Sequence, residues 1–337
     1  MNRRCNFSDM FRNSKVLVAG GAGFVGVNLI NRLLELGASI TATLHNKPAV
    51  INDNRIRYIK CDLTKTKDCA QAVKGADYVF MCAANTSGAA VMEKTPLVHV
   101  TPNIVMNTLT LEAAYEADVQ KFLFISSNTV YPAAEHPVKE DEMIPGQLFE
   151  KYFCVGWMKQ FTEVLCRMYT EKIKKTMNTI VVRPANIYGP NDDFEWETSH
   201  VLPALIRKVV ERHDPIEVWG DGNDIKDFIY IDDFVEGILS AMEKLDTFVP
   251  INIATGVPCS IKQALDAILQ ADEYTNANVV FNSSKPTMIP KRLIDTTRAK
   301  QLLDFKAKTS IIEGIKKTID WYRQTRNLTR PKRFTKQ

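Results

Sequence analysis

The sequence predicts an α/β protein: a doubly wound parallel sheet of the Rossmann type followed by a smaller C-terminal α/β lobe. Three observations predict this fold. Short β-branched runs alternate with helical patterns from residue 15 onward, and this alternation is typical of βαβ units. A glycine-rich turn directly follows the first of these runs. After about residue 190 the alternation weakens, which indicates a second, smaller unit.

The elements are predicted in chain order from apolar spacing. Runs rich in Val, Ile, Phe and Tyr predict strands at 15–19, 39–44, 55–61, 78–82, 122–126 and 179–182. Helical spacing predicts helices at 25–36, 68–73, 103–117 and 153–171. Beyond them we expect short strands at 216–219 and 228–231, a helix from near Asp233, a loop at 285–289 and an amphipathic helix at 311–322.

These elements suggest four segments. We expect an N-terminal extension at 1–14, a dinucleotide-binding domain at 15–183, a mainly substrate-binding lobe at 184–322 and a basic tail at 323–337. The chain is expected to return to the first domain near 217–258. The tail carries six basic residues and no acidic one: Arg323, Arg326, Arg330, Lys332, Arg333 and Lys336.

Composition excludes several classes of protein. The 337 residues carry 43 Lys and Arg against 39 Asp and Glu, a net charge of +4, which is too small to indicate a nucleic-acid or membrane partner. No run approaches the roughly 18 apolar residues of a membrane span, and no secretory signal is evident. The seven cysteines form no C-x-x-C pair, so we expect neither a metal site nor disulfides, and a cytoplasmic location.

The strongest local motif is the glycine turn at Gly20, Gly23 and Gly26, which ends a strand and opens a helix. The first glycine permits the tight turn, the second permits close approach of a pyrophosphate, and the third permits helix–strand packing. The helix N-terminus supplies N–H donors and a positive dipole. The motif predicts binding of a dinucleotide.

The end of the second strand distinguishes NAD from NADP. An NAD site commonly places a carboxylate there to bind the ribose 2′-hydroxyl, whereas this chain has His45 and Lys47. NADP is therefore favoured and NAD is the alternative. Asp62, after the third strand, is a candidate for the adenine or for a helix N-cap.

Longer motifs resemble the extended short-chain dehydrogenase/reductases that act on nucleotide-diphosphate sugars, NAD(P)-dependent epimerases and dehydratases, and most of all their GDP-L-fucose synthase branch. The landmarks over about residues 15–323 are the glycine trio, Cys61-Asp-Leu63, Cys82-Ala-Ala84, Ser126-Ser-Asn-Thr-Val-Tyr-Pro132, Arg183-Pro-Ala-Asn-Ile-Tyr-Gly-Pro190, Ser199-His-Val-Leu-Pro203, Val218-Trp-Gly-Asp-Gly222 and Ser284-Lys-Pro286. The resemblance implies a cofactor site at Gly20, Gly23, Phe24, Val25, His45, Asp62, Leu63, Ala83 and Lys159.

In this family a tyrosine exchanges a proton with the substrate, a lysine four residues later lowers its pKa, and a Ser or Thr shares the hydrogen bond. Ser127 matches the Ser or Thr. Tyr152 is followed four residues later by Gly156, and Lys159 is preceded four residues earlier by Val155. The Tyr/Lys pair is therefore broken in either register, although Glu163 and Tyr169 favour Lys159 as the family's lysine. The proton is left to a displaced Tyr152, to Ser127, to Thr129 or to water.

The fucose synthase branch also epimerises carbons beside the sugar ketone with a Cys and a His. His200 matches the His, but Thr129 stands at the Cys position, and a threonine hydroxyl is too weak an acid to replace a thiolate base. The resemblance further implies substrate contacts that gather cations at a diphosphate. The implied substrate-side residues are Thr129, Asn186, His200, Lys208, Trp219, Lys226 and Arg292.

The sequence therefore favours an NAD(P)-dependent oxidoreductase acting at C4 of a nucleotide-diphosphate hexose. A GDP-sugar in cell-surface glycan precursor synthesis is expected. One alternative is a 4-epimerase or dehydratase that retains its cofactor; another is a cofactor-binding protein with impaired catalysis. From the resemblance we expect a homodimer, and we expect no nucleic-acid or membrane partner.

Overall fold

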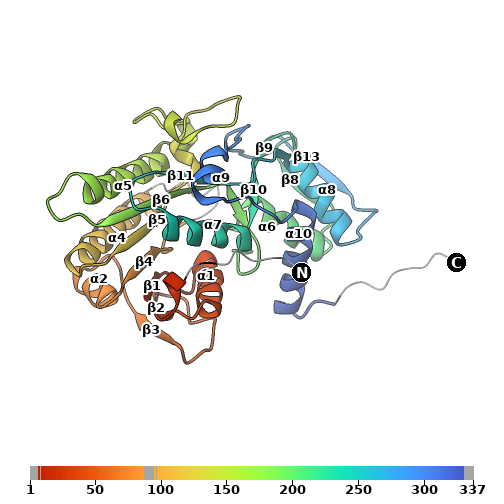
Figure 1. The fold of residues 1–337 in the computed structure, drawn as a ribbon. Coiled ribbons are helices and arrows are strands. Elements are labelled where there is room, and N and C mark those ends of the chain that lie inside the picture. Colours follow the sequence, from red (N-terminus) through yellow and green to blue (C-terminus); the bar gives the residue numbers. More distant parts are fainter. Residues whose placement is uncertain (1–6, 8, 87–94, 96, 330–337) are drawn as a thin grey trace.

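A seven-stranded parallel sheet forms the larger unit of the computed structural model, which describes residues 7, 9–86, 95 and 97–329. The strand order is β3-β2-β1-β4-β5-β6-β11 (Figure 1). The strands are β1 (Lys15–Ala19), β2 (Ser39–Leu44), β3 (Ile56–Lys60), β4 (Tyr78–Met81), β5 (Lys121–Ile125), β6 (Asn178–Pro184) and β11 (Ile251–Ile253). The order reverses between β1 and β4, as in doubly wound folds. The predicted fold class is confirmed.

Helices cover both faces of the sheet, because parallel strands are apolar on both sides. One face carries α1 (Phe24–Glu35) and α7 (Ile231–Lys244), which contact each other (Figure 1). The other carries α2 (Thr66–Val73), α4 (Leu97–Glu116) and α5 (Phe153–Glu171). A separate cluster of buried apolar side chains fills each face. The carboxyl ends of the strands are thereby left as the edge on which a site can form.

The smaller lobe is built from strand pairs and a group of packed helices. The pairs are β7 (Asn186–Tyr188) with β10 (Phe228–Tyr230), β8 (Ile216–Trp219) with β13 (Val279–Asn282), and β9 (Ile225–Lys226) with β12 (Cys259–Ser260). The packed helices are α6 (Val201–Val210), α8 (Ile261–Ala271) and α10 (Ile311–Thr325), while α9 (Thr297–Leu303) lies against α7 and β11. The chain therefore returns to the large sheet through α7 and β11.

Helix α4 begins at Leu97, six residues before the predicted start, and contains Pro102. A proline inside a helix leaves the carbonyl four residues earlier without its usual donor. Here that carbonyl belongs to Val98, and the side-chain amide of Asn85 donates to it at 2.9 Å. Because a residue from the loop after β4 replaces the missing N–H, the helix extends through the proline.

The C-terminal helix also exceeds its prediction. α10 runs to Thr325, and Arg323 is buried with its guanidinium on Asp272 at 2.8 Å. Arg326 pairs with Glu195. Two cations of the expected tail are thus paired with carboxylates of the lobe; the other four lie outside the described residues.

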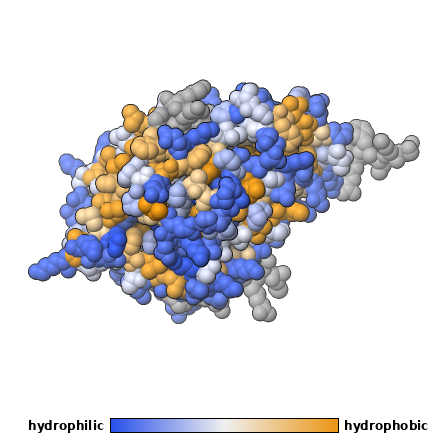
Figure 2. All heavy atoms as spheres, turned by 90° about the horizontal axis from the view of Figure 1, so that it is seen from above, coloured by the Kyte–Doolittle hydropathy of each residue, from blue (hydrophilic) through white to orange (hydrophobic). Residues whose placement is uncertain are grey.

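The surface mixes polar and apolar character. Hydrophilic and hydrophobic residues are interspersed over the face seen in Figure 2. Within the described ranges, we find no helix that combines the length and apolar character needed to cross a bilayer.

Candidate functional site

The glycine turn after β1 is closely packed. Gly20 has a φ of +85°, and a Cβ there would lie 2.7 Å from the backbone of Ala83; a Cβ on Gly26 would lie 2.2 Å from the carbonyl oxygen of Gly20. The N–H of Gly20 donates to Thr43 Oγ1 at 2.8 Å, which fixes the turn to β2. Only glycine fits positions 20 and 26 without displacing backbone.

The start of α1 offers hydrogen-bond donors to an anion. The first N–H groups of a helix have no acceptor within it, and the N-cap residue Gly23 has no side chain to accept from them. Phe24 and Val25 therefore present their N–H groups at the carboxyl edge of the sheet. This cradle fits a dinucleotide pyrophosphate.

The ends of β2 and β3 carry the predicted adenosine-side residues. His45 and Lys47 are exposed just after β2. Asp62 follows β3 and accepts from the N–H and hydroxyl of Thr64 at 3.1 and 2.6 Å, and these hydrogen bonds lower its pKa. The N-cap of α2 is Lys65, so the expectation of Asp62 as a helix N-cap was wrong. Leu63 is buried beside it.

The loop after β4 is held by α4. Ala83 lies against Gly20, and Asn85 exchanges hydrogen bonds with Asn103, whose amide donates to the Asn85 carbonyl at 2.9 Å while its oxygen accepts from the Asn85 N–H. The sequence analysis missed Asn85 and Thr43. For Asn85 the available signal was a polar side chain shortly after the apolar strand β4, whereas Thr43 lies inside β2, where no local pattern distinguishes it.

Lys159 lies at the end of β5. Its ammonium donates to the carbonyl of Ile125 at 2.8 Å and lies 4.8 Å from the centre of the Phe124 ring. Burial lowers the pKa of Lys159 to about 8, and the carboxylate of Glu163 opposes this shift. Because Ile125 immediately precedes Ser126 and Ser127, Lys159 and the candidate serine share one corner of the site.

Ser127 and Thr129 form the turn that follows. The hydroxyl of Ser127 accepts from the N–H of Thr129 at 3.1 Å and caps the short helix η2 (Asn128–Val130). Thr129 Oγ1 is buried and has no hydrogen-bond partner among the described residues. A buried unsatisfied hydroxyl is costly, so this atom is a candidate for contact with a bound group.

The structure does not bring Tyr152 to Lys159. Tyr152 precedes α5 as its N-cap residue, and its hydroxyl faces the lobe. Burial raises the pKa of Tyr152, while the backbone N–H of Ile289 and the guanidinium of Arg292 oppose this shift. The charged group that affects the pKa of Lys159 is the carboxylate of Glu163.

The two possible registers of the Tyr/Lys pair, Tyr152 with Gly156 and Val155 with Lys159, differ in the space available for the missing side chain. A Cβ on Gly156 would lie 2.8 Å from the carbonyl oxygen of Thr129 and 2.7 Å from the side chain of Leu148, so the lysine that the Tyr152 register requires at this position does not fit without displacing the turn. Val155 is partly exposed and lies one turn before Lys159 on the same face. The geometry favours Val155 as the residue that replaces the tyrosine.

Two buried cations of the lobe lie near Tyr152 or near its neighbour Ile289. Lys226 donates to the carbonyl of Ile289 and lies 3.4 Å from Asp224. Arg292 is 3% exposed, and its guanidinium donates to the carbonyls of Tyr131 and Pro132 at 3.1 and 2.8 Å. Its Nε has no partner among the described residues. Burial lowers the pKa of both cations.

The other substrate-side residues lie on β7, β8 and α6. Lys208 donates to the Glu217 carbonyl at 2.6 Å, and exposed Trp219 ends the same strand, β8. Asn186 begins β7, where its N–H donates to Asp227. His200 is the exposed N-cap residue of α6, and the surrounding protein lowers its pKa.

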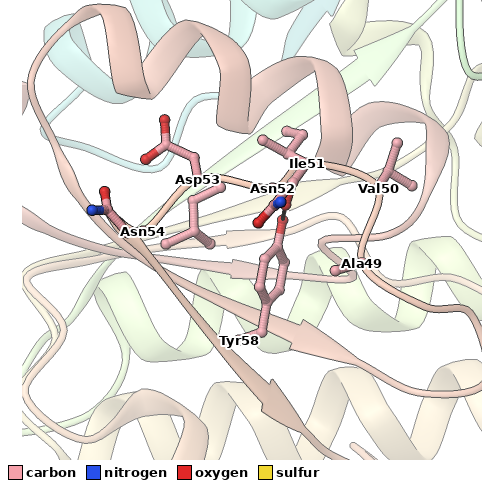
Figure 3. A pocket seen from close by; sticks show the side chains of 8 residues that line it. Ala49, Val50, Ile51, Asn52, Asp53, Asn54 and Tyr58 are labelled. Atoms are coloured by element: carbon pink, nitrogen blue, oxygen red, sulfur yellow. Dashed lines mark hydrogen bonds between the residues drawn. The ribbon is translucent and has the colours of Figure 1, made fainter.

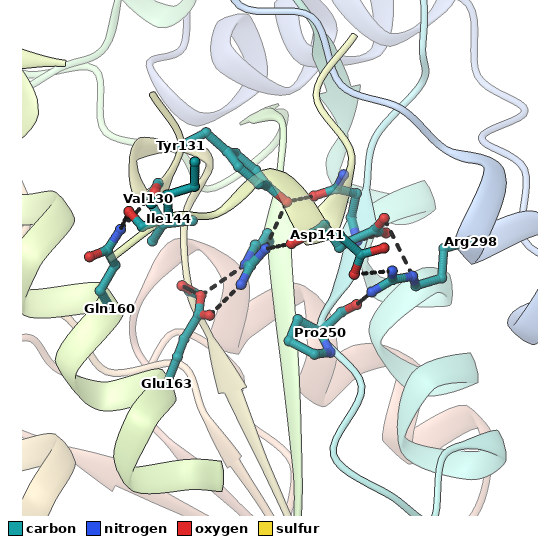
Figure 4. Close-up of polar contacts among 12 residues, drawn as sticks. Val130, Tyr131, Asp141, Ile144, Gln160, Glu163, Pro250 and Arg298 are labelled. Atoms are coloured by element: carbon teal, nitrogen blue, oxygen red, sulfur yellow. Dashed lines mark hydrogen bonds and ion pairs between the residues drawn. The ribbon is translucent and has the colours of Figure 1, made fainter. Parts of the chain in front are cut away.

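A buried polar network supports the Lys159 corner (Figure 4). Ser126 donates to Glu163, and Arg183 forms a double hydrogen bond to the same carboxylate at 2.6 and 3.0 Å. Arg183 also donates to Tyr131, whose hydroxyl donates to Asn252 at 2.6 Å. The network therefore ties α5 to β5, β6 and β11.

Further features of the described residues lie outside this site. A hollow of about 410 Å³ lies under the loop before β3, between Val50 and Tyr58, whose hydroxyl donates to Ile51 (Figure 3). Within the described ranges, no His, Cys, Asp and Glu cluster could hold a metal. Asp232 and Asp233 do not cap α7, because its N-cap is Tyr230; Asp233 accepts instead from the N–H groups of residues 308 and 309.

Comparisons with known proteins agree with this site. Residues 16–254 match the model of the NAD dependent epimerase/dehydratase family. The GDP-L-fucose synthase of Escherichia coli K12 is 29% identical over 91% of this chain and 96% of its own length. The UDP-glucose 4-epimerase of Thermotoga maritima, solved with UDP-glucose, is 25% identical, covers 92% of this chain and 99% of its own, and superposes with a TM-score of 0.83.

A third relative was solved with a nicotinamide cofactor. The UDP-glucuronic acid 4-epimerase of Bacillus cereus, a mutant solved with NAD, is 26% identical, covers 93% of this chain and all of its own, and has a TM-score of 0.79. These findings confirm the resemblance seen in the motifs and the expectation of an enzyme. The chain belongs to the NAD-dependent epimerase/dehydratase family, whose members here act on nucleotide sugars.

Proposed function

We propose that this enzyme moves a hydride between a nicotinamide cofactor and C4 of a nucleotide-diphosphate hexose, with a GDP-sugar as substrate, in the synthesis of a cell-surface glycan precursor. The observation that carries the proposal is the Lys159 ammonium held 2.8 Å from the carbonyl of Ile125, beside Ser127 and at the same sheet edge as the glycine turn. The name of the E. coli relative supports the GDP-sugar.

The glycine turn fits the cofactor, because the missing side chains of Gly20 and Gly26 let the turn pack closely on Ala83 and on the start of α1, whose first N–H groups are donors for a pyrophosphate. Phe24 and Val25 would bind the pyrophosphate, and Lys159 would hold the nicotinamide end. When bound, the cofactor supplies or accepts the hydride. NADP is favoured because the end of β2 presents His45 and Lys47 without a carboxylate that would repel a 2′-phosphate; competing titrations with NADPH and NADH test this preference.

Proton transfer to the C4 oxygen needs a donor other than residue 155, because the valine there has no acidic proton. Tyr152 points to the lobe, so Ser127, or a water beside Thr129, is the proposed donor. Lys159 would stabilise negative charge developing on that oxygen, because a cation in a partly buried site acts strongly on a nearby charge. The cost of losing a positioned acid is about 10²–10⁴-fold in rate.

The same site lacks a base for epimerisation. Thr129 occupies the position of the family's Cys, and its buried hydroxyl cannot remove a carbon-bound proton at neutral pH. His200 alone does not complete the pair. We therefore infer reduction or oxidation at C4 without the two epimerisations.

The test combines purified enzyme with NADPH and a GDP-4-keto-sugar while absorbance at 340 nm is followed. Consumption of NADPH supports the proposal. Product formed at constant absorbance indicates a 4-epimerase or dehydratase with retained cofactor, a candidate that the T. maritima neighbour favours. No turnover with any nucleotide sugar indicates a catalytically impaired cofactor-binding protein, which the valine at position 155 favours.

Matched variants test the site itself. Val155→Tyr adds a phenol one turn from Lys159 and should raise kcat, by up to about 10²-fold, whereas Val155→Phe adds the ring without the hydroxyl and should not. Lys159→Met should lower kcat strongly, with the exposed Lys172→Met at the end of the same helix as control. Unchanged activity in Lys159→Met would contradict the assignment.

We also propose a homodimer. Five apolar side chains of α5, each 42–51% exposed, recur at helical spacing along one stripe: Phe153, Trp157, Phe161, Val164 and Met168. Leu97 and Val98 of the neighbouring α4 are exposed too. An apolar stripe of this length is typical of a protein interface, and a twofold axis would cover it with its own copy.

A further inference from the structure

We propose that Glu163 is a positioning residue of this site, which holds Lys159 over the end of β5 and keeps it cationic. The inference rests on the proposed function of Lys159. It starts from the buried network, whose members lie on four elements and which the chemistry of hydride transfer does not itself require (Figure 4).

The first step is geometric. Glu163 lies four residues after Lys159 on α5, so the two side chains lie on one helix face with their Cβ atoms about 6 Å apart. Lys159 binds the carbonyl of Ile125, and Glu163 accepts from the hydroxyl of Ser126. The helix is therefore fastened to two consecutive residues at the end of β5, directly before Ser127. A shift of α5 along the sheet would break both contacts.

The second step concerns the carboxylate. Glu163 is 2% exposed, and Arg183, on β6, holds it by two hydrogen bonds. Arg183 is in turn fixed by the carbonyl of Glu140 at 2.9 Å and by the hydroxyl of Tyr131. A buried ion pair adds little net stability compared with apolar residues. The effect of the Glu163 carboxylate on the neighbouring Lys159 ammonium therefore says more about its role than its contribution to stability does.

The third step is electrostatic. Burial disfavours the charged form of Lys159, and the Glu163 carboxylate counteracts it. The other groups that contact the Lys159 ammonium among the described residues are neutral and lie on β5: the Phe124 ring and the Ile125 carbonyl. Cys166, one turn beyond Glu163, stays a neutral thiol because burial raises its pKa. The negative charge that favours the ammonium is that of Glu163, while Arg183 partly offsets it.

Competitive labelling with acetic anhydride between pH 6 and 11, quantified by mass spectrometry of the peptide containing Lys159, measures its titration directly and needs no turnover. Glu163→Gln should lower the titration midpoint by about one pH unit, a tenfold loss of ammonium at a given pH above the midpoint. Glu163→Asp keeps the charge and should largely restore the midpoint. Glu171→Gln, on the exposed end of α5, is the control and should leave it unchanged.

Glu163→Gln leaves the buried Arg183 without its carboxylate and can unfold the chain. The double variant Glu163→Gln/Arg183→Met removes both charges, avoids that cost and should lower the midpoint as well. A midpoint equal to the wild-type value in the folded variant, or an equal fall in the Gln and Asp variants, overturns the proposal. If NADPH is never consumed but the midpoint shifts as expected, the hydride-transfer proposal fails and the role of Glu163 stands.

Discussion

Replacing Gly26 by alanine tests the cofactor cradle. The added Cβ would lie 2.2 Å from the carbonyl oxygen of Gly20, whereas ordinary contacts begin near 3.4 Å, so helix and turn must separate by about 1.2 Å. The neighbouring atoms are backbone and cannot rotate away. Forcing a methyl group into a packed position costs about 1–3 kcal/mol, and the displaced turn is the one that would meet the pyrophosphate.

Because binding would have to press the displaced turn back toward its wild-type position, we expect that free energy to oppose binding and NADPH affinity to fall about 5- to 150-fold, at 1.4 kcal/mol per factor of ten. Fluorescence titration with NADPH measures it. Gly75→Ala is a matched control: Gly75 has a φ of +73° but no atom within 4 Å of an added Cβ, so the change should lower stability and leave binding intact. Wild-type affinity in Gly26→Ala would refute the assignment of this turn to the cofactor.

Three further predictions concern the remaining structure. Burial raises the pKa of Asp192 to about 8, so the stability from its protonated form is complete below pH 4 and lost by about pH 8; Asp192→Asn should raise Tm at pH 8 and leave it unchanged near pH 4. Trp157→Glu should convert a dimer to a monomer in analytical ultracentrifugation, and an unchanged mass would exclude α5 as the interface. Arg323→Met removes one of the two guanidinium groups on buried Asp272, the other being that of Arg212, and should cost about 2 kcal/mol in urea unfolding, against under about 1 kcal/mol for the exposed Arg326→Met; equal losses would contradict the burial argument.

The fold was predictable because its signals are local. Alternating apolar runs and the glycine trio define strands and helices within short windows, and the bounds of α5 agree with the prediction at both ends. The early start of α4 was not predictable, because the N–H group that compensates for Pro102 comes from Asn85, outside the helix. The buried position of Arg323 likewise depends on Asp272, 51 residues away.

The broken Tyr/Lys pair could be read from the sequence, but its geometry could not. On an ideal helix, Tyr152 would return to nearly the same face as Lys159 after two turns. The helix instead begins at Phe153, after the short turn η4 (Glu150–Tyr152). Helical spacing therefore does not define the direction of the Tyr152 side chain. The neighbouring Ile289 and Arg292 lie beside its hydroxyl instead.

The lobe-side cations give an independent reason to expect an anionic ligand. Lys226 and Arg292 are 8% and 3% exposed, and Asp224 is the carboxylate that offsets the Lys226 charge. Arg292 binds backbone carbonyls, and its Nε has no hydrogen-bond partner in the described part of the chain. Burying a cation without a full counter-charge destabilises a folded protein, and both pKa values are lowered accordingly. A diphosphate between Lys226 and Arg292 would supply the missing negative charge. Binding of such a ligand would therefore also relieve the cost of burying the two cations.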